Sequence, residues 1–561
     1  MDHDYDIIVI GSGFAGPVAA RLCAEKGLKT LMIERSEQVG EKVISGLTIP
    51  VYGFLFGPAF IRDGNPPIER PVDGIINYIV KDIDAADFEI DDSLMIPRPL
   101  SPVLAFGYNA YCMPFCQWEA QKAVEAGAEL LTSRAVTDLI REDGVVTGVI
   151  IEDGRRIRSR IVIDAEGSQG LVAVKAGIRK RYPPEAISLA DTYDYVMPKA
   201  AIDALFGHSI RFCWGWDEQR IAPPLGHGNG LMVWPYRESL HFMQDQCLRL
   251  DGKRVVKLKR AFDEYHRRIT TKLPWWADEV APHVRLRARM WEGFEIFVGL
   301  DDELAAMPNH TDGMIMIGDA AGLESTELCD GVPAAWFSAE IAAEVAAKAL
   351  RKGDTSARFL SRYDRKVKRH PIIRWSIRAT NRYNLRKAQQ SHDEDELKRY
   401  VHGGWGLGAL KDISTPLMRM MLTSLVRDPR LIASWARMFF RYYHNWHHNR
   451  FDYADEKGQT PGRRDKKRTT GEKAFAAVMR RIDTLLLVFG PIVRLLALLL
   501  IPFAWLANPL AHIALPLFEP LYLRLVKASK APADRLSGRI VAFAAGSDRS
   551  VFTVRSGRRR D

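Results

Sequence analysis

The sequence predicts an α/β protein in which a Rossmann-type domain receives an inserted α+β domain and is followed by a helical, hydrophobic C-terminal region. Residues 4–35 show a β-branched strand, a glycine-rich turn, a helix and a second apolar strand, which is the pattern of one βαβ unit. Residues 313–322, GMIMIGDAAG, return to a buried strand that ends in a glycine-containing turn. These two distant pieces, with strand-rich sequence between them, indicate a discontinuous Rossmann domain.

Shifts in composition divide the chain into expected domains. We expect a cofactor-binding domain in two pieces, a substrate domain, a helical region, a charged linker, a hydrophobic membrane-associating segment and a basic tail. Their ranges, in that order, are 1–170 with 300–352, 171–299, 353–453, 454–473, 474–530 and 531–561. Residues 50–110 are rich in proline, glycine and aromatic residues with weak periodicity, so we expect irregular structure there.

The composition restricts the class of protein. With 561 residues, 47% hydrophobic and 26% charged, the chain resembles folded globular proteins, which excludes a disordered chain and a polytopic membrane protein. The net charge is +10, and the excess basic residues cluster in two segments near the C-terminal end of the sequence, 463–468 and 555–560. Neither segment contains a nucleic-acid-binding motif. We therefore expect no nucleic-acid partner, and basic runs beside apolar sequence favour an anionic lipid surface. Six scattered cysteines and a start without a secretory signal pattern predict a reducing cytoplasm.

The first glycine-rich turn is the strongest candidate for a ligand site. Its G-x-G-x-x-G pattern permits a tight turn, close approach of the backbone to a pyrophosphate, and close packing of helix on strand. A glutamate ends the next strand, where its carboxylate can accept hydrogen bonds from ribose hydroxyls. The residues of this unit that we expect to bind the cofactor are Gly11, Gly13, Phe14, Ala15, Gly16, Glu34 and Arg35. The alternative is a glycine-rich turn without a ligand.

The choice of cofactor needs a second element, because NAD enzymes share this pattern. Together, GSGFAGPVAARLCAEKGLKTLMIER, VIDAEG and IGDAAG resemble the FAD-dependent superfamily of geranylgeranyl reductases, FixC-type dehydrogenases and electron-transfer flavoprotein:quinone oxidoreductases. The stretches EKVISG, FCQWEAQKAVEAGAE and GLMVWPYRES extend the resemblance over about residues 4–350. The resemblance implies a glutathione-reductase-like FAD-binding domain, FAD as the cofactor, and oxidoreductase activity.

The resemblance also implies roles for residues near the second glycine turn. Asp319, after Gly318, would bond the ribityl chain of FAD, and the backbone at Gly331 and Val332 would approach the pyrimidine edge of the flavin. A helix N-terminus at that edge would stabilise the negative charge of the reduced flavin. The alternative for Asp319 is a helix N-cap or turn residue.

The chain departs from the family pattern in several places. Cys112 stands where the family commonly has a cofactor-contacting arginine, Cys116 replaces a common aspartate, and Glu166 replaces an aspartate in VIDAEG. Cys112 and Cys116 would share a helix face, and we favour buried thiols over a redox pair. The last cysteine is Cys329, so we do not expect the four-cysteine iron–sulfur domain of the quinone oxidoreductases. If electrons enter or leave singly, a separate partner, such as a ferredoxin-like protein or an electron-transfer flavoprotein, must supply the cluster, or the flavin must cycle through its own semiquinone.

Two further groups of residues are candidates for binding. Trp234 and Tyr236, in GLMVWPY, could form a substrate wall, because strand ends beside a flavin commonly line such sites; core packing of Trp234 is an equal alternative. His444, His447 and His448 have helical spacing, but no carboxylate or cysteine set accompanies them. We therefore favour an interfacial aromatic helix and expect no metal. The sequence identifies no proton donor.

Residues 484–507 form an apolar segment long enough for one bilayer crossing. Arg494 near its middle is costly at the bilayer centre, and Pro491 and Pro502 interrupt helical hydrogen bonding. Basic residues flank the apolar sequence on both sides, so both flanks favour the cytoplasmic side. We therefore favour a monotopic or re-entrant platform at the cytoplasmic side of a membrane over a single spanning helix. A buried helical hairpin without lipid contact is the third interpretation.

These observations lead to one principal hypothesis and two alternatives. The principal hypothesis is a membrane-surface FAD oxidoreductase that exchanges electrons between flavin and a lipid-soluble partner, either a quinone or an isoprenoid or other lipid double bond. The first alternative is an FAD-dependent monooxygenase that reacts with oxygen. The second is a flavin-binding electron-relay subunit.

Overall fold

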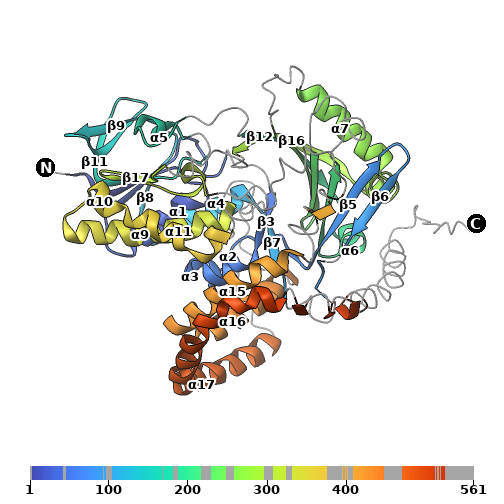
Figure 1. Cartoon of the computed structure of the whole chain (residues 1–561). Helices are drawn as coiled ribbons and strands as arrows, with labels where there is room; N and C mark the ends of the chain where they lie inside the picture. The colour runs from blue at the N-terminus through green and yellow to red at the C-terminus, as the bar shows by residue number, and fades with distance from the viewer. Residues whose placement is uncertain are drawn as a thin grey trace, which may run out of the picture.

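Two units built on β-sheets lie side by side, with the C-terminal helices beneath them in the view of Figure 1. The computed structural model describes residues 3–41, 46–92, 94–96, 104–167, 170–180, 187–215, 229–247, 258–295, 307–323, 331–375, 395, 398–399, 401, 408–447, 470–511, 513–514, 517–518, 520–522 and 524.

The first unit is built on a parallel sheet with a buried central strand. Strand β1 pairs in parallel with β2 and β11, so that Ile8 stands beside Leu31 and Val162. Apolar runs such as YDIIVI suit this position, because both faces of a parallel sheet are covered. In spatial order the parallel strands are β18 (Met314–Met316), β11 (Arg156–Asp164), β1 (Tyr5–Ile10), β2 (Thr30–Ile33) and β8 (Glu129–Leu131). The attached antiparallel strands are β9 (Val136–Glu142), β10 (Val145–Ile151) and β17 (His310–Thr311).

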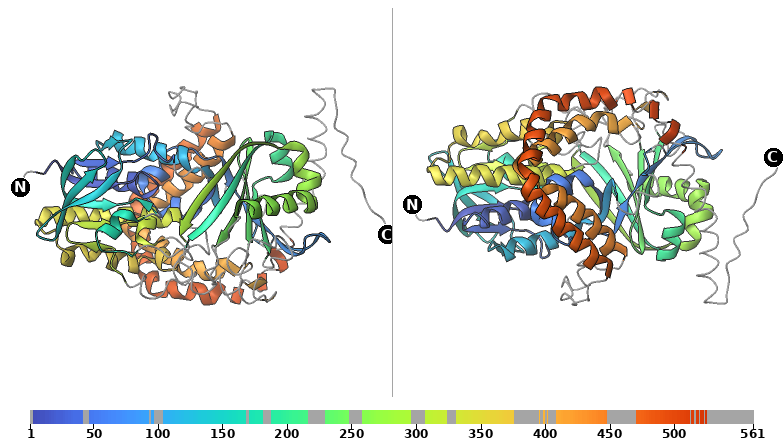
Figure 2. Two further views of the ribbon diagram at one scale, coloured as in Figure 1. Left: turned by 90° about the horizontal axis from the view of Figure 1, so that it is seen from above. Right: turned by 90° about the horizontal axis from the view of Figure 1, so that it is seen from below.

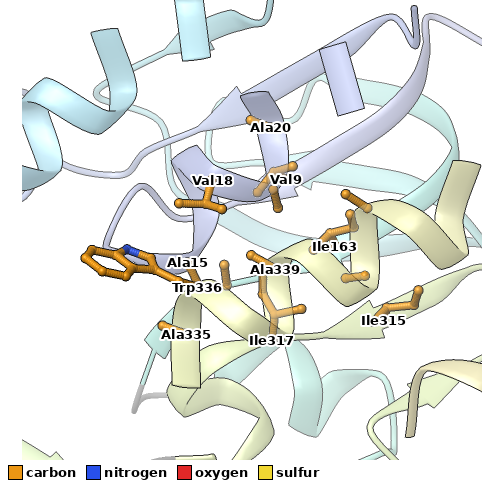
Figure 3. Packing of buried hydrophobic residues seen from close by; sticks show 14 of the residues in the cluster. Val9, Ala15, Val18, Ala20, Ile163, Ile315, Ile317, Ala335, Trp336 and Ala339 are labelled. Atoms are coloured by element: carbon orange, nitrogen blue, oxygen red, sulfur yellow. The ribbon is translucent and has the colours of Figure 1, made fainter. Parts of the chain in front are cut away.

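Small side chains let two helices pack closely on this sheet. Figure 3 shows Ala15 of the first of these helices near Ala335 of the second, with Ile163 and Ile315 of the sheet in the same buried cluster. Alanines at such a contact let the helix backbones approach each other, and the buried apolar area stabilises the unit. These two helices are α1 (Ala15–Ala24) and α9 (Gly331–Lys352), and α4 (Cys112–Glu125) also packs against α1.

The second unit is a seven-stranded sheet that draws on two parts of the chain. In spatial order its strands are β16 (Arg285–Glu295), β12 (Ile187–Val196), β15 (Ser239–Cys247), β14 (Asn229–Pro235), β13 (Ser209–Gly215), β5 (Gly74–Asp82) and β6 (Asp87–Asp91). Strand β5 runs parallel to β13, and β6 is antiparallel to β5. The expected ranges 1–170 and 171–299 thus divide the chain differently from its sheets, since residues 74–91 pair within the second sheet.

The two faces of the second sheet have different surroundings. Leu231 and Val233 of β14 pack under helices, whereas Met232 and Trp234 belong to an apolar cluster on the opposite face, as the alternation of side chains in a strand requires. The covering elements are α6 (Lys199–Leu205), α7 (Leu258–Lys272) and the π-helix η3 (Trp275–Val280). The face of Trp234 is therefore the one available to the rest of the molecule.

The expectation of irregular structure over residues 50–110 is wrong. This part of the chain contributes to a small antiparallel sheet of order β3–β7–β4, and Figure 1 shows β3 and β7 between the two larger units. The same range also supplies β5 and β6 of the second sheet. Apart from β5, each element is too short to produce a visible hydrophobic period, which explains the error. The elements are β3 (Gly46–Pro50), α2 (Val51–Phe56), α3 (Ala59–Arg62), β4 (Arg70–Val72) and β7 (Gly107–Tyr111).

The C-terminal helices are fixed to the segment around the small central sheet through α16. Tyr442 donates its hydroxyl hydrogen to the carbonyl of Ile61 at 2.7 Å, and the Trp435 indole N–H donates to the carbonyl of Leu55 at 2.8 Å. These bonds join α16 to α2 and α3. Figure 2 shows the last helices spread over the lower face of the molecule. The helices of this region are α10 (Ala357–Leu360), α11 (Arg362–Arg369), α15 (Gly408–Arg427), α16 (Leu431–His447), α17 (Thr470–Leu500) and the 3-10 helix η7 (Ile501–Leu506).

Candidate cofactor and substrate site

The carboxyl ends of β1 and β11 meet at the first glycine-rich turn. Gly11 follows β1 with a φ of +92°, a left-handed conformation that glycine adopts without strain. A β-carbon on Gly11 would lie 2.5 Å from the carbonyl oxygen of Ala165, which follows β11. Glycine therefore lets these two strand ends come together. In open α/β sheets, ligands bind outside the carboxyl ends of the strands at such a point.

Gly13 and Gly16 have different surroundings in the same turn. A β-carbon on Gly16 would lie 2.0 Å from the carbonyl oxygen of Gly11, so Gly16 lets α1 begin directly against the turn. At Gly13 no heavy atom of the described residues lies within 4 Å of the corresponding position. Phe14 and Ala15 then lead into α1. Open space at Gly13 beside a helix N-terminus suits a pyrophosphate, because backbone N–H groups point toward it.

Glu34 is held beside this turn by three hydrogen bonds. Its Oε2 accepts from the backbone N–H of Ser12 at 3.0 Å and from the Ser12 hydroxyl at 2.6 Å, and its Oε1 accepts from the N–H of Ser36 at 2.9 Å. A carboxylate has about four acceptor sites, so the side chain retains capacity for a ribose hydroxyl. Arg35 is exposed next to it.

The second glycine turn lies against the first. Gly318 has a φ of +61°, and a β-carbon there would lie 3.2 Å from the β-carbon of Ala15. The N–H of Gly318 donates to the Ser338 hydroxyl of α9 at 3.0 Å. Asp319, with a partly exposed side chain, lies in the short 3-10 helix η5 (Gly318–Ala321). The fold thus brings Asp319 to the same sheet edge as the first turn.

Helix α9 begins near this edge and extends the site toward the second unit. Gly331 and Val332 form its first described turn, with Val332 buried. Helix α9 packs against both η5 and β3. The backbone of Gly331 and Val332 therefore lies in the helix that connects the second glycine turn to the small central sheet.

Cys112 and Cys116 of α4 are both fully buried. Burial raises the pKa of the Cys116 thiol well above its ordinary value, so the thiol stays protonated and weakly nucleophilic. This environment is typical of structural thiols. Glu166 has a capping role that the sequence did not indicate, because its Oε1 accepts from the N–H of Val172 at 2.5 Å in the first turn of α5 (Leu171–Lys175).

Tyr236 and Trp234 lie on the face of the second sheet that points away from α7. Both side chains are buried, and the Tyr236 ring stacks on Tyr111 of β7 with centroids 4.4 Å apart. A β-carbon on Gly46 of β3 would lie 1.8 Å from the Tyr236 hydroxyl oxygen. Because β3 also packs against α9, Tyr236 is the predicted substrate residue that the fold brings toward the cofactor side. Trp234 packs in the apolar cluster, as the alternative interpretation holds.

Three polar residues that the sequence did not single out lie beside Tyr236. His241 of β15 stands opposite Asp194 of β12, with Nε2 3.3 Å from Oδ1. Arg287 Nε lies 2.6 Å from Asp194 Oδ2, and Arg287 Nη2 donates to the Tyr111 hydroxyl at 3.0 Å. For His241 and Asp194, the signal that could have found them is their alternation with core residues along β15 and β12.

The charge states of this group follow from burial and from its neighbours. Burial acts to raise the pKa of Asp194, but His241 and Arg287 hold it below its ordinary value. Burial lowers the pKa of His241. At neutral pH the group therefore contains an ionised Asp194, a charged Arg287 and a neutral imidazole.

The expected helical face of His444, His447 and His448 lies outside the described side chains. His444 and His447 lie in α16, but their side chains and the whole of His448 lie outside what the structure describes. Among the described residues, no group of three or more histidine, cysteine, aspartate and glutamate side chains could hold a metal ion.

The parallel sheet, the two glycine turns and the carboxylate at the end of β2 define a dinucleotide-binding α/β protein. A family model described as FAD dependent oxidoreductase matches residues 6–290, just over half of the chain. The chain belongs to this family, and it is an FAD-dependent oxidoreductase. Open space at Gly13 and the carboxylates of Glu34 and Asp319 fit the pyrophosphate, ribose and ribityl groups of FAD.

Relatives and solved structures are consistent with this membership. FixC of Azorhizobium caulinodans is 30% identical over 216 residues, which cover 37% of this chain and 46% of FixC. The digeranylgeranylglycerophospholipid reductase of Methanospirillum hungatei is 23% identical over 437 residues, which cover 77% of this chain and 96% of the reductase. A geranylgeranyl bacteriochlorophyll reductase-like protein from Thermoplasma acidophilum has a similar fold, with a TM-score of 0.54 and 20% identity over 73% of this chain and 98% of that one. The chain thus aligns with less than half of FixC but with nearly all of the reductase.

Proposed function

We propose that this chain is a membrane-surface reductase in which reduced FAD transfers electrons to an isoprenoid double bond of a membrane lipid. The observation that carries the proposal is a large exposed apolar surface attached to an FAD-dependent oxidoreductase. A relative named digeranylgeranylglycerophospholipid reductase, aligned over 96% of its length, supports an isoprenoid lipid as substrate. A quinone is the alternative lipid-soluble electron acceptor. A ferredoxin-like protein or an electron-transfer flavoprotein is the candidate electron donor.

The apolar surface extends along α17 and the residues after it. Soluble proteins rarely expose a continuous apolar patch of more than a few hundred Å². Within the described residues, one helix, Lys473–Ala511, is long and apolar enough to cross a membrane, and only 11% of its most apolar window is buried. The exposed apolar side chains are Leu485, Leu487, Val488, Phe489, Ile492, Leu495, Leu496, Leu498, Leu499, Leu500, Phe503, Trp505, Leu510, Ile513, Leu517, Phe518 and Leu521. Lipid is the partner whose chemistry matches so many exposed leucines.

Polar contacts along this segment favour attachment to one leaflet over a crossing. Asp483 pairs with Arg437 of α16 at 2.7 Å, and Arg494 donates to the carbonyl of Arg427 at the end of α15 at 3.3 Å. Further on, Asn508 accepts from the Ser414 hydroxyl of α15 at 2.7 Å. Because the segment is tied to the protein near both ends and in the middle, it would have to break these contacts to traverse a bilayer. A monotopic platform retains them.

The chemistry of the proposed reaction assigns separate tasks to the cofactor and the chain. Bound FAD in its reduced state supplies a hydride, and reduction of a double bond also requires a proton at the neighbouring carbon. The chain would hold the cofactor at the two glycine turns and would present the apolar face of the second sheet to the lipid chain. The Tyr236 side of that face lies beside β3, which packs on α9.

Binding to liposomes tests the membrane part of the proposal. The purified protein should co-sediment with vesicles that contain anionic phospholipid. A Leu487→Glu/Leu498→Glu double variant should bind much more weakly, because two charges enter the apolar surface. Ile90→Glu is the control, since Ile90 is also an exposed apolar residue but lies on β6 of the second unit, outside the apolar segment. Equal binding of the double variant and the parent would contradict a lipid-facing α17.

Anaerobic reoxidation of the flavin tests the substrate part. The protein is reduced with dithionite in detergent, mixed with a geranylgeranyl phospholipid, a quinone or oxygen, and followed by flavin absorbance. We expect reoxidation by the isoprenoid lipid with a product that has gained two hydrogens. If only the quinone reoxidised the flavin rapidly, the acceptor would be a quinone and the proposed isoprenoid substrate would be wrong. Oxygen-dependent hydroxylation of a product would instead identify a monooxygenase.

A further inference from the structure

The Tyr236 hydroxyl is a buried polar group directed at the central strand β3. Its side chain is completely buried, and among the described residues no hydrogen-bond partner reaches the hydroxyl oxygen. His241 Nδ1 is likewise buried and without a partner in the described part of the chain. A β-carbon on Gly46 would lie 1.8 Å from Tyr236 Oη and 3.0 Å from His241 Nδ1. The Tyr236 hydroxyl, just after β14, and an imidazole nitrogen of the neighbouring β15 thus converge on one glycine.

We propose that Tyr236 Oη is the proton donor for the reduced double bond and that His241, oriented by Asp194, restores its proton. This inference rests on the proposed function. A hydride from reduced FAD forms one C–H bond, the proton of Tyr236 forms the second at the adjacent carbon, and the π bond between the two carbons is lost. The electron pair of the O–H bond stays on the phenolate oxygen. His241 then takes up a proton from solvent, becomes an imidazolium beside the ionised Asp194, and passes one proton to the phenolate, which returns His241 to the neutral imidazole.

Burial and charge support this role for Tyr236. Burial raises the pKa of Tyr236 well above its ordinary value, so the hydroxyl keeps its proton at neutral pH. It would release the proton only when negative charge develops on a carbon next to it. An unpartnered buried hydroxyl costs free energy, and such a group in a folded protein calls for a functional explanation. The ionisable groups that face Tyr236 and His241 from the surrounding elements are Glu69, Tyr111, Cys112, Asp194 and Arg287.

A route to solvent leads away from Tyr236. The Tyr236 and His241 rings are 4.7 Å apart, and His241 Nε2 lies 3.3 Å from Asp194 Oδ1. The side-chain exposure rises from 0% at His241 to 7% at Asp194 and 50% at Arg287. An ionised Asp194 stabilises an imidazolium when His241 collects a proton. His241 and Asp194 are therefore positioning residues for the proton of Tyr236.

The decisive variant is Tyr236→Phe, which removes only the hydroxyl oxygen. We expect unchanged FAD content, an unchanged anaerobic reduction spectrum and a urea midpoint equal to or above that of the parent. Reoxidation of the reduced flavin by a geranylgeranyl phospholipid should slow by about 100-fold or more, the usual contribution of a general acid. Tyr265→Phe is the control, because Tyr265 of α7 is equally buried against the opposite face of the same sheet. It should reoxidise at the parental rate.

A second variant separates proton donation from proton recovery. In His241→Gln the first turnover should keep its rate, because Tyr236 is already protonated, whereas steady-state turnover should fall about tenfold. A merely structural role for His241 would lower both rates together and would overturn the positioning role. If Tyr236→Phe reduces the lipid at the parental rate, or if it loses FAD or unfolds at lower urea, Tyr236 is not the donor, although the proposed function stands. If the parent protein does not reduce the lipid, both proposals fail.

Discussion

Glu119 of α4 accepts a hydrogen bond from the indole N–H of Trp336 of α9 at 2.7 Å, and both side chains are fully buried. The second carboxyl oxygen of Glu119 has no partner among the described residues. Burial raises the pKa of this carboxyl well above its ordinary value. The bond therefore joins α4 to the helix that begins at the proposed flavin edge, and it does so with a neutral carboxylic acid.

The neutral state of Glu119 predicts a pH-dependent effect of its replacement. Because its folded pKa is raised, its contribution to stability is complete below about pH 4.3 and falls as the pH rises, since the unfolded chain then releases the proton. Glu119→Gln keeps an acceptor for Trp336 and has no proton to lose. Its urea midpoint should exceed that of the parent at pH 8, and the difference should shrink toward pH 4.

Glu119→Ala is the matched variant for the same site. It leaves the Trp336 N–H unsatisfied and opens a cavity, so the free energy of unfolding should fall by about 2 kcal/mol or more at pH 7. Urea unfolding followed by tryptophan fluorescence measures both variants. A Glu119→Gln protein that is less stable than the parent at pH 8 would show that the carboxyl is ionised in the fold.

Two neighbouring glycines should respond differently to the same substitution. Gly13→Val places its side chain in open space, so the protein should fold while its FAD content falls at least about tenfold, because the side chain occupies the place of the pyrophosphate. Gly16→Val places a β-carbon 2.0 Å from the carbonyl oxygen of Gly11, so folding itself should fail. Circular dichroism and the flavin released on denaturation distinguish the two outcomes. Full FAD content in Gly13→Val would place the pyrophosphate elsewhere.

The first glycine turn could be predicted because all of its determinants are local. The strand, turn, helix and next strand follow one another within residues 4–35, and both Gly11 and Glu34 take the positions that the pattern requires. The apolar segment after Thr484 could be recognised for the same reason. Composition within one short window contains all the information that such features need.

The second sheet and the Tyr236 group could not be predicted because their contacts join distant parts of the chain. Strand β5 pairs in parallel with β13, so that Gly74 lies beside Ser209. The hydrophobic pattern of neither segment indicates that the two strands pair. His241 and Asp194 alternate with core residues, a pattern that usually marks a solvent face. In this fold that face turns toward the small central sheet, and the same alternation produces a buried polar group.

His370 should make the stability of the fold sensitive to mild acid. Its Nδ1 accepts from the N–H of Ile373 at 3.4 Å, and its ring lies 4.4 Å from that of Phe337 in α9. Burial, with a smaller contribution from Arg427, lowers the pKa of His370 from 6.5 to about 4. Below pH 6.5 His370 is protonated in the unfolded chain but stays neutral in the folded protein. The contribution of His370 to stability is therefore complete above that pH and is lost as the pH falls toward 4.

The variant His370→Asn tests this dependence, because asparagine can also accept from the Ile373 N–H but does not titrate. Between pH 7 and pH 4.5 the free energy of unfolding of the parent should fall more steeply than that of the variant, by about 1.4 kcal/mol for each pKa unit of the shift. Urea unfolding at several pH values provides the measurement. His3→Asn, at an exposed position, should follow the parent. Parallel pH profiles for His370→Asn and the parent would mean that His370 is protonated in the fold.

Asn508 should control how firmly the end of the apolar segment is held on α15. Its Oδ1 accepts from the Ser414 hydroxyl and from the N–H of Thr415, each at 2.7 Å, and its own N–H donates to the Thr415 hydroxyl at 3.1 Å. Asn508→Ala removes the first two bonds, so the local opening free energy of residues 501–511 should fall by about 1–3 kcal/mol. Asn508→Asp retains an acceptor at the same place and should change it less. Hydrogen exchange measures this opening, with amides of β1 as the internal reference. If 501–511 exchanged at the parental rate in Asn508→Ala, the apolar packing of η7 on α15 would be sufficient to hold the segment without these hydrogen bonds.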